Sequence, residues 1–475
     1  MVTRHRSDAP PDVRPSAVLT VCLLAVFMQM LDLTVMATAL PALAEDLAIA
    51  GSTQVLVFSA YGLAFGSTLL SAARLRDRYG CRPLMLVGLA VFTLASAWCA
   101  MAQGAMELAA ARALQGLGAA AVAAQTIVVI TATFESRARI RAFGLHGAVS
   151  GLAGLAGPLV GGLLVGLGSD GLGWRMIFLL NLPIGVLALL LAYRHIRIDG
   201  GRASVSLELP SAALSVIGAA MVLGALAGVA DRGWSAALVV TLVAGSAVLA
   251  GFGVRQRHLA TSGRRALIGP ELFADRAFRV GSLLMFVFYG LFAALLFSVS
   301  VTTQTGLGWT AVRTALTLLP FAVGAVVAAA ATPLLLARLG GPTVTVGLLL
   351  FAVAVLVLAR TLHPGDGVVD TGALPIPLFL AGAGMGLAVV PLPAVMVAAL
   401  GERATGDASG MAPTVQQLGS AFGAAVLGSM FLARADGGSH TYLAACQFVL
   451  WSVAAVGGVA ALTSVRLPRT LGGAS

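Results

Sequence analysis

Long apolar runs alternate with short polar segments along the whole chain. Each run holds about 18 to 24 residues, which at 1.5 Å per residue is enough to cross roughly 30 Å of hydrocarbon. About fourteen such runs can be marked, with cores near 17–39, 54–73, 83–102, 108–131, 143–165, 175–193, 211–230, 235–254, 280–301, 315–337, 343–362, 374–400, 415–432 and 442–465. The pattern predicts an all-α integral membrane protein with 14 transmembrane helices.

The composition excludes a soluble protein. The chain has 475 residues, of which 59% are hydrophobic and 10% charged, and its mean hydropathy is +0.97. A soluble domain carries about 25% charged residues, so this chain cannot cover a globular surface with solvated groups. No polar segment exceeds roughly 25 residues, which is well short of a minimal domain of about 50 residues. We therefore expect neither a large aqueous domain nor an enzyme.

Arginine is distributed unevenly between the two sets of loops. The formal charge is +10, and all 29 basic residues are arginine. If the N-terminus is cytoplasmic, 23 arginines lie in the tails and the even-numbered loops, 5 lie in the opposite loops, and Arg112 lies inside a helix. Cytoplasmic loops of membrane proteins hold an excess of basic residues. We therefore expect both termini to be cytoplasmic, and the basic charge indicates topology rather than a nucleic-acid partner.

Two polar connections, Arg194 to Pro210 and Arg255 to Arg279, divide the helices into groups of six, two and six. The predicted organisation is an N-terminal six-helix bundle over 1–199, two inserted helices over 200–260 and a C-terminal six-helix bundle over 261–475. A short segment, Leu336 to Gly341, stands between helices 10 and 11 where Leu75 to Gly80 stands between helices 2 and 3. Two such blocks are typical of transporters built from repeats.

Only two charged residues lie well inside the predicted spans, Asp32 in helix 1 and Arg112 in helix 4. Each costs about 2.5–3.5 kcal/mol at a helix centre on insertion scales. Counting from the helix ends places them at similar depths, so they can pair across a cavity. One interpretation is a purely structural ion pair. The other, which we favour because no other acid lies mid-membrane, is that Asp32 takes up and releases a proton beside Arg112.

Glycines recur at steps of three or four residues in the fifth run. They are Gly147, Gly151, Gly154, Gly157, Gly161 and Gly162, with Pro158 among them. The spacing predicts one glycine face that lets another backbone come close, and Pro158 favours a bend. Tight packing and a moving contact both remain open interpretations.

Other polar chemistry inside the spans is sparse. The main polar side chains in or near them are Gln29, Gln115, Gln125, Gln304, Gln416 and Gln417, which can line a cavity. No cluster of His, Cys, Asp or Glu has metal-ligand spacing, and the chain has no GxxxxGK[ST] loop for ATP phosphates. We expect no metal and no cofactor, and ATP-driven or hydrolytic chemistry is disfavoured.

Five short motifs occur in order at the expected helices. They are Leu31-Asp32-x-Thr34-Val35 through Pro41, Asp77-Arg78-x-Gly80-x-Arg82, Arg112-x-x-Gln115-Gly116-x-Gly118, Gly154-x-x-Gly157-Pro158-x-x-Gly161-Gly162, and Trp174-Arg175 with Asn181-x-Pro183. In these motifs the chain resembles the major facilitator superfamily, and specifically its 14-helix drug:proton antiporters. The resemblance runs across the chain.

This resemblance implies the major-facilitator fold and a proton-coupled efflux transporter. Such a protein exports lipophilic drugs, dyes or an antibiotic-like natural product by alternating access. The implied roles are proton coupling for Asp32 and Arg112, cytoplasmic gating for Asp77, Arg78, Gly80 and Arg82, and the antiporter helix-5 motif for Gly154, Gly157, Pro158, Gly161 and Gly162. Candidate substrate-binding residues are Gln29, Thr34, Ala37, Gln115 and Gln125.

Three positions depart from the family pattern. The loop signature usually opens with Gly, where this chain has Ala73, and it usually has a basic residue where Cys81 follows Gly80. Both departures concern cytoplasmic gating. Ala37 stands where the helix-1 signature usually has Asn, which removes an amide near Asp32 and bears on substrate range.

We further expect a multi-pass protein of the bacterial inner membrane that functions as a monomer. Its expected partners are a small lipophilic substrate, protons and membrane lipid. Two other hypotheses remain open: a proton-coupled nutrient symporter, and a membrane-embedded sensor or scaffold that transports nothing. Energy-dependent efflux separates the three, because an exporter lowers accumulation of its cargo, a symporter raises it and a scaffold changes neither.

Overall fold

Helices and short connections make up the computed structural model. The structure describes residues 14–168, 172–198, 208–262, 264, 266–267, 269–362, 369–397, 402–435 and 437–467, without the side chains of 136, 209, 270, 397 and 402–409. Within these ranges there is no strand. Helices form along the apolar runs because, in lipid, a helix satisfies its backbone hydrogen bonds internally.

The helices follow the chain in the order that the apolar runs predict. The first group comprises α1 (Pro15–Asp46), α2 (Gly51–Tyr79), α3 (Cys81–Met101), α4 (Ala105–Thr133), α5 (Ser136–Leu167), α6 (Met176–Leu179) and α7 (Asn181–His195). The inserted pair is α8 (Leu209–Arg232) and α9 (Ala236–Thr261). The last group comprises α10 (Arg276–Val301), α11 (Ala311–Leu339), α12 (Pro342–Thr361), α13 (Pro375–Val389), α14 (Leu392–Val397), α15 (Glu402–Gly423), α16 (Ser429–Leu432) and α17 (Ser439–Ser464).

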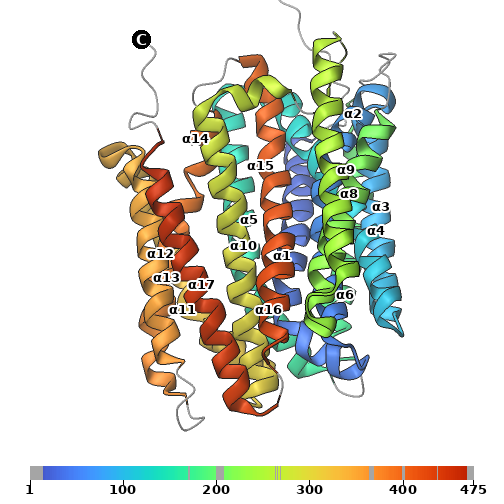
Figure 1. Ribbon diagram of the computed structural model, residues 1–475. Coiled ribbons are helices and arrows are strands. Elements are labelled where there is room, and N and C mark those ends of the chain that lie inside the picture. Colours follow the sequence, from blue (N-terminus) through green and yellow to red (C-terminus); the bar gives the residue numbers. More distant parts are fainter. Residues whose placement is uncertain are drawn as a thin grey trace, which may run out of the picture.

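Fourteen segments of the described chain are long and apolar enough to cross a membrane, which confirms the predicted count. Some spans contain a break: α6 meets α7 at Leu180, and α15 continues into α16 through a π-helical turn, Ala424–Gly428. Because the number of spans is even, α1 begins at the face where α17 ends (Figure 1). We call this the terminal face and the other the far face.

The second polar connection is shorter than the sequence predicted. Helix α9 runs on to Thr261, so Arg255 belongs to a helix rather than to a loop. Its guanidinium lies 2.9 Å from the Glu208 carboxylate at the start of α8, which ties the ends of the inserted pair together. The predicted domain boundary at 199/200 lies outside the described residues, and the one at 260/261 falls in the last turn of α9.

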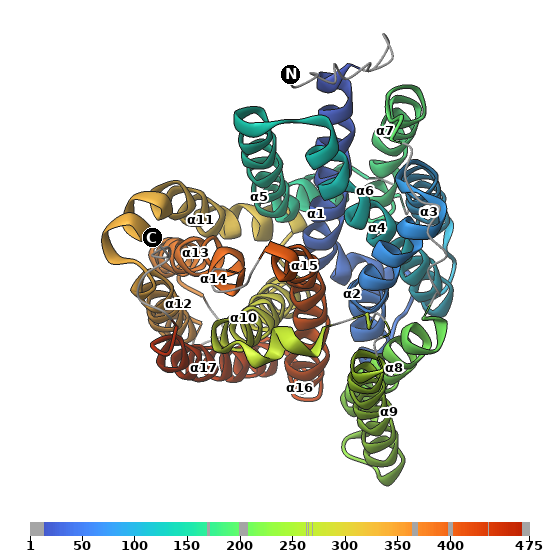
Figure 2. The same cartoon turned by 90° about the horizontal axis from the view of Figure 1, so that it is seen from above.

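Seen from above, the helices form two groups with the inserted pair at one side (Figure 2). Helices α1 to α7 pack mainly on one another, and so do α10 to α17. The two groups meet where α2 packs against α15 and α5 against α11. The inserted pair is attached through α8, which packs on α2, while α9 lies almost entirely outside the bundles.

The two helix groups make the same close contacts between helices, through residues at corresponding positions. A Cβ on Gly116 of α4 would press on the Tyr61 carbonyl and lie 3.1 Å from the Phe65 nitrogen of α2. A Cβ on Gly382 of α13 would likewise press on the Phe321 carbonyl and lie 3.0 Å from the Ala325 nitrogen of α11.

A second pair of contacts follows two residues further along each helix. Gly118 approaches Gly88 and Phe92 of α3, as Gly384 approaches Gly347 and Phe351 of α12. Helices α2, α3 and α4 therefore match α11, α12 and α13 in turn.

The glycines of α5 do not form the single packing face that the sequence predicted. Gly157 and Gly161 lie against Thr34 and Val35 of α1, whereas Gly162 lies against Ala311 of α11. Gly147, Gly151 and Gly154 have no atom within 4 Å of where a Cβ would stand. Helix α5 is thus in close contact in its half nearer the far face and open in the half nearer the terminal face.

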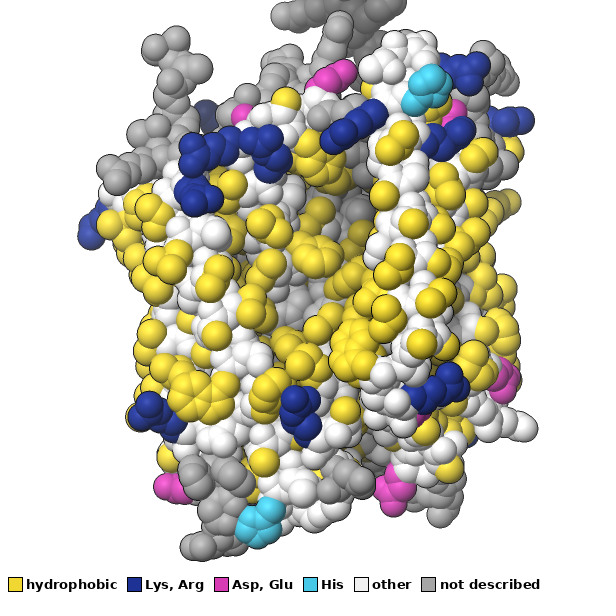
Figure 3. Space-filling model, viewed as in Figure 1, with side chains coloured by type: hydrophobic (Ala, Val, Ile, Leu, Met, Phe, Trp, Pro, Cys, Tyr) yellow, Lys and Arg dark blue, Asp and Glu magenta, His cyan; other side chains and the backbone are white. Residues whose placement is uncertain are grey.

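The outer surface has the pattern expected for lipid contact. In Figure 3, arginines gather toward the two ends of the molecule, and hydrophobic side chains cover the zone between them. Arginine can lie at such a boundary because its stem packs on apolar surface while its head reaches water.

Candidate transport site

The two intramembrane charges form a direct ion pair inside the first group of helices. Arg112 Nη1 lies 2.5 Å from Asp32 Oδ2, and the two residues are 0% and 1% exposed. Helix α1 brings the carboxylate and α4 brings the guanidinium. The expectation that they pair is met, but they do not face each other across a cavity, because helices pack around the pair on all sides.

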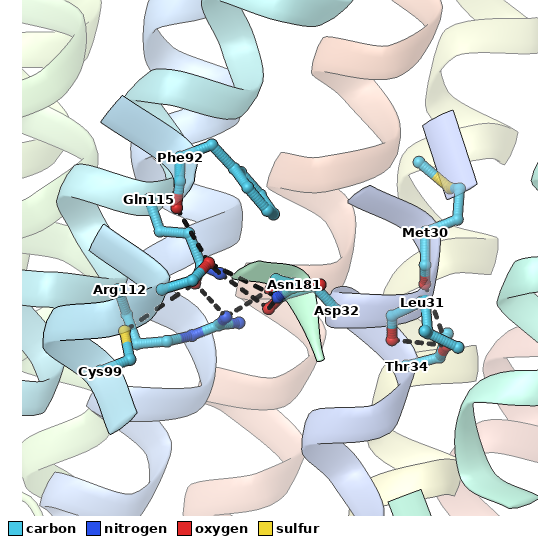
Figure 4. A network of polar contacts seen from close by, with 10 residues as sticks. Met30, Leu31, Asp32, Thr34, Phe92, Cys99, Arg112, Gln115 and Asn181 are labelled. Atoms are coloured by element: carbon cyan, nitrogen blue, oxygen red, sulfur yellow. Dashed lines mark hydrogen bonds and ion pairs between the residues drawn. The ribbon is translucent and has the colours of Figure 1, made fainter. Parts of the chain in front are cut away.

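Two amides complete the shell of Asp32, as Figure 4 shows. Gln115 Nε2 donates to Asp32 Oδ1 at 2.8 Å, and Asn181 Nδ2 donates to the same oxygen at 3.0 Å. Gln115 Nε2 also donates to Ser96 Oγ at 2.8 Å, while Gln115 Oε1 accepts from Arg112 Nη1 at 2.6 Å. Residues from α1, α3, α4 and α7 therefore share one buried polar network.

The remaining contacts of Arg112 are aromatic. Its guanidinium carbon lies 4.7 Å from the centroid of the Tyr61 ring and 5.7 Å from that of Phe178. Its Nε and Nη2 have no hydrogen-bond partner in the described structure. A cation over an aromatic face is stabilised by the ring quadrupole, and the effect grows when water is excluded.

Asn181 and Ser96 were not among the candidate site residues from sequence. Asn181 begins α7 and is fully buried, and it is the one asparagine in the whole chain. A single asparagine in so apolar a sequence is a signal that sequence reasoning could have used. Nothing in the sequence marks Ser96, because small hydroxyl residues are common in membrane helices and bond to their own backbone.

A cavity of about 1010 Å³, counting the part that opens to solvent, lies between the two helix groups. Its wall draws on α1, α2 and α5 on one side and on α10, α11, α13 and α15 on the other. A cavity between helix groups that is lined mostly by apolar side chains, with a few polar groups among them, is typical of a small-molecule site. The aromatic side chains on its wall are Phe58, Tyr289 and Phe292.

Of the predicted substrate-binding residues, Thr34 and Ala37 lie on this wall. Gln29 instead donates to the Ala119 carbonyl at 3.3 Å and Gln125 to the Ala72 carbonyl at 3.4 Å, while Gln115 belongs to the ion-pair network. These three amides form hydrogen bonds with buried groups inside the first helix group and do not line the cavity. Among the other glutamines, Gln416 lines the cavity.

The predicted gating residues lie where α2 meets α3. Gly80 joins the two helices with φ at 89°, a conformation that only glycine adopts without strain. Asp77 accepts from its neighbour Arg76 at 3.3 Å, and Arg82 donates to the Tyr193 carbonyl of α7 at 3.0 Å. Arg78 packs on the Tyr79 ring. None of these partners of Asp77, Arg78 and Arg82 lies in the second helix group.

One residue of the same segment does reach beyond the first helix group. Arg74 Nη2 donates to the Ala266 carbonyl at 2.6 Å, in the connection that leads from α9 to α10. This bond joins the connection before the second group to the terminal end of α2.

No group of three or more His, Cys, Asp or Glu residues that could hold a metal ion gathers among the described residues.

The arrangement defines a class of protein. Two groups of membrane-spanning helices enclose a central cavity, and they repeat the same helix contacts, which is the architecture of a secondary membrane transporter. The family model described as Major Facilitator Superfamily matches residues 22–424. The chain belongs to this superfamily.

Several relatives are named for antibiotics. The chain is 35% identical over 427 residues to a probable actinorhodin transporter of Streptomyces coelicolor, covering 89% of this chain and 73% of that one. It is 34% identical to the puromycin resistance protein pur8 of Streptomyces alboniger, covering 96% and 91%. It is 30% identical to a methylenomycin A resistance protein of Streptomyces coelicolor, covering 91% and 88%.

Solved structures support the fold. A bacterial homologue of the human lysosomal transporter Spinster, in an inward-facing and occupied conformation, aligns with a TM-score of 0.66 at 14% identity, covering 95% of this chain and 96% of that one. A structure of a proton-dependent oligopeptide transporter aligns with a TM-score of 0.67 at 14% identity, covering 95% and 98%. The major-facilitator fold is thereby confirmed.

Proposed function

We propose that this protein is a proton-coupled efflux transporter that exports a small lipophilic molecule by alternating access. The observation that carries the proposal is the buried Asp32–Arg112 pair with its two amides. A carboxylate enclosed in this way can exist in two protonation states, and the balance between them depends on the guanidinium beside it. A protein that uses a proton gradient needs such a group.

The energy of one proton is sufficient for useful export. One elementary charge is worth about 2.3 kcal/mol per 100 mV, so a force of roughly 150–200 mV sustains a solute gradient of about a few hundred-fold to a few thousand-fold. In the proposed cycle, Asp32 is the proton-binding group and Arg112 is the cation that pairs with it. Uptake of the proton neutralises the Asp32 carboxylate and weakens its bonds to Arg112, Gln115 and Asn181, and release of the proton restores them.

The direction of transport is inferred from the relatives. Those described above are named for transport of, or resistance to, antibiotics, which favours export of an antibiotic-like or other lipophilic compound. The likeness to a proton-dependent oligopeptide transporter keeps symport as the hypothesis to test against.

We propose a bacterial inner-membrane location with both termini cytoplasmic, in a transporter that works as a monomer. The 23-to-5 distribution of arginine supports the cytoplasmic position of the termini. The terminal face is then cytoplasmic, and the open half of α5 corresponds to an inward-facing state. Reporters fused at either terminus should respond as cytoplasmic, and a reporter inserted between Arg360 and Leu374 as external. Termini on opposite sides would contradict this topology.

The proposal also gives roles to the residues where α2 meets α3 and to the glycines of α5. Asp77, Arg78 and Arg82 would hold the cytoplasmic side when it closes, and Gly157 and Gly162 would let α5 approach α1 and α11. The open glycines of α5 would then accept close neighbours in the outward-facing state. Gly157→Leu should abolish export without preventing insertion, because its side chain would collide with Thr34.

Reconstituted vesicles test the function directly. The purified protein is placed in vesicles with an imposed pH gradient, and uptake of lipophilic antibiotics and dyes is followed in both gradient orientations. An exporter moves cargo against its concentration gradient in exchange for protons. Movement of cargo in the same direction as protons indicates a symporter, and the absence of transport across the panel would overturn the proposal.

A further inference from the structure

The walls of the central cavity carry no formal charge among the residues that the structure describes. The polar side chains there are Thr34, Ser150, Tyr289, Gln416 and Ser420, all of them neutral, and the rest of the described lining is apolar. An organic cation bound in lipid surroundings is stabilised most strongly by a carboxylate near its charge, because an unpaired buried charge is costly.

The one buried carboxylate of the described structure is not available to such a cation. Residues Met30, Leu33, Thr34 and Ala37 form the cavity side of α1, at the spacing of one helix face. Asp32 stands about 200° around the helix from Met30 and from Thr34, because each residue turns by about 100°. Figure 4 shows Asp32 directed at Arg112 and Gln115, with Thr34 on the other side of α1.

The Asp32 carboxylate is also fully engaged. Its Oδ2 accepts from Arg112 and its Oδ1 accepts from both Gln115 and Asn181. Helix α1 therefore separates a cation in the cavity from this carboxylate, whose charge Arg112 already compensates. Arg112, which would attract an anion, is equally enclosed, with no exposed surface.

The neutral groups of the cavity favour a particular kind of uncharged molecule. Phe58, Tyr289 and Phe292 offer aromatic faces, and Met30 and Met385 offer flexible thioethers that adapt to flat ring systems. Pro158 has no N–H, so the carbonyl of Gly154 on the cavity wall lacks the donor that this position would otherwise supply. That carbonyl can accept a hydrogen bond from a phenolic O–H or an amide N–H of the cargo.

From these observations we propose that the cargo crosses as an electrically neutral aromatic molecule, and that the cavity rejects permanent cations because the walls that the structure describes carry no carboxylate. The inference rests on the proposed export function and narrows its substrate class. It assigns the proton and the cargo to opposite faces of α1, so the two do not compete for the same atoms. Coupling then passes through movement of α1 itself.

The test uses the full-length protein in vesicles with a pH gradient and two fluorescent probes. Nile red is uncharged, and ethidium is a permanent aromatic cation. The parent protein should export Nile red at least tenfold faster than ethidium, each rate being measured above that of protein-free vesicles. Parent export of ethidium within twofold of the Nile red rate would overturn the inference while leaving the export function intact. Export of neither probe would contradict both.

Paired variants determine whether charge is the cause. Met385→Glu places a carboxylate on the cavity wall and should raise ethidium export at least tenfold, whereas the isosteric Met385→Gln should not. Ala329→Asp and Ala329→Asn form a second pair on α11, which keeps the test decisive if the first glutamate variant folds poorly. Equal gains from the acid and the amide in the pair that folds would overturn the inference, because shape rather than charge would then explain the selectivity.

Discussion

The two helix groups share their close contacts but differ in what they bury. Helices α2, α3 and α4 meet at the same glycine registers as α11, α12 and α13. By that register, Arg112 corresponds to Leu378, Gln115 to Ala381, Ser96 to Val355 and Tyr61 to Phe321, all of them buried. Every polar member of the first network that can be matched in this way has an apolar counterpart in the second group.

This difference shows which buried residues the helix packing requires and which it does not. The second group reaches the same helix contacts with Leu378 and Val355, so the fold does not need a charge or a hydroxyl at these positions. Buried ion pairs seldom stabilise more than apolar residues of similar volume, because desolvation offsets their attraction. A costly network in one of two equivalent sites is therefore best explained by a task that only one group performs.

The largest effect is expected from Asp32→Asn. The amide keeps the shape and hydrogen-bonding capacity of the side chain but cannot bind and release a proton. Export driven uphill by a pH gradient should fall at least tenfold, while exchange of cargo down its own gradient continues. The measurement is transport in reconstituted vesicles with well-folded protein.

Asp46→Asn is the matched control for this experiment, since it makes the same change at the end of the same helix. Asp46 bonds to Trp174 and Arg175 near the far face rather than to the network. This variant should retain proton-driven export. Uphill export by Asp32→Asn at nearly the parent rate would move the proton site elsewhere and remove the contrast between the two groups.

Arg112→Leu copies the second group at a single position and should be strongly destabilising. It leaves the Asp32 carboxylate buried without its cation, which costs about 3–5 kcal/mol when one partner of a buried pair is removed. Thermal unfolding in detergent measures the loss.

The double variant Asp32→Leu with Arg112→Leu should regain most of that stability and still lack proton coupling. It would make the first group resemble the second in charge as well as in contacts. A double variant as unstable as Arg112→Leu alone would show that the network is required for folding, contrary to the comparison.

Packing itself should respond equally in the two groups. Gly116→Ala and Gly382→Ala each place a methyl group against a backbone carbonyl of the neighbouring helix, and overpacking of this kind costs about 1–3 kcal/mol. Both variants should lower the unfolding temperature by similar amounts. Gly251→Ala in α9 is the control, because no atom lies within 4 Å of its added Cβ. Clearly unequal losses at Gly116 and Gly382 would weaken the claim of matched registers.

The smallest effect is expected from Ser96→Val, which copies Val355. The change removes an acceptor for Gln115 at 2.8 Å and leaves the Asp32–Arg112 pair in place. One hydrogen bond contributes about 0.5–1.5 kcal/mol, so the rate of uphill export should fall between about twofold and tenfold. Val355→Ser in the second group should leave that rate unchanged. Complete loss of coupling in Ser96→Val would give the hydroxyl a direct part in proton transfer.

Some features of this protein were determined by its sequence alone. The spans follow from apolar runs of sufficient length, because lipid leaves the backbone no alternative to a helix. Asp32 and Arg112 could be identified as candidate site residues because they are the two charged residues well inside the predicted spans. Even the partnership of these two residues could be anticipated from their depths.

Only the tertiary structure shows which side chains lie on the same surface. Helix α1 has two faces of similar polarity in the sequence, and only packing shows that Thr34 faces the cavity while Asp32 faces away from it. Asn181 joins Asp32 from 149 positions along the chain, and the glycines of α5 divide between two partners. Apolar periodicity could not reveal these arrangements, because a helix surrounded by lipid and protein is apolar on all sides, so its rotation is fixed by neighbours that are distant in sequence.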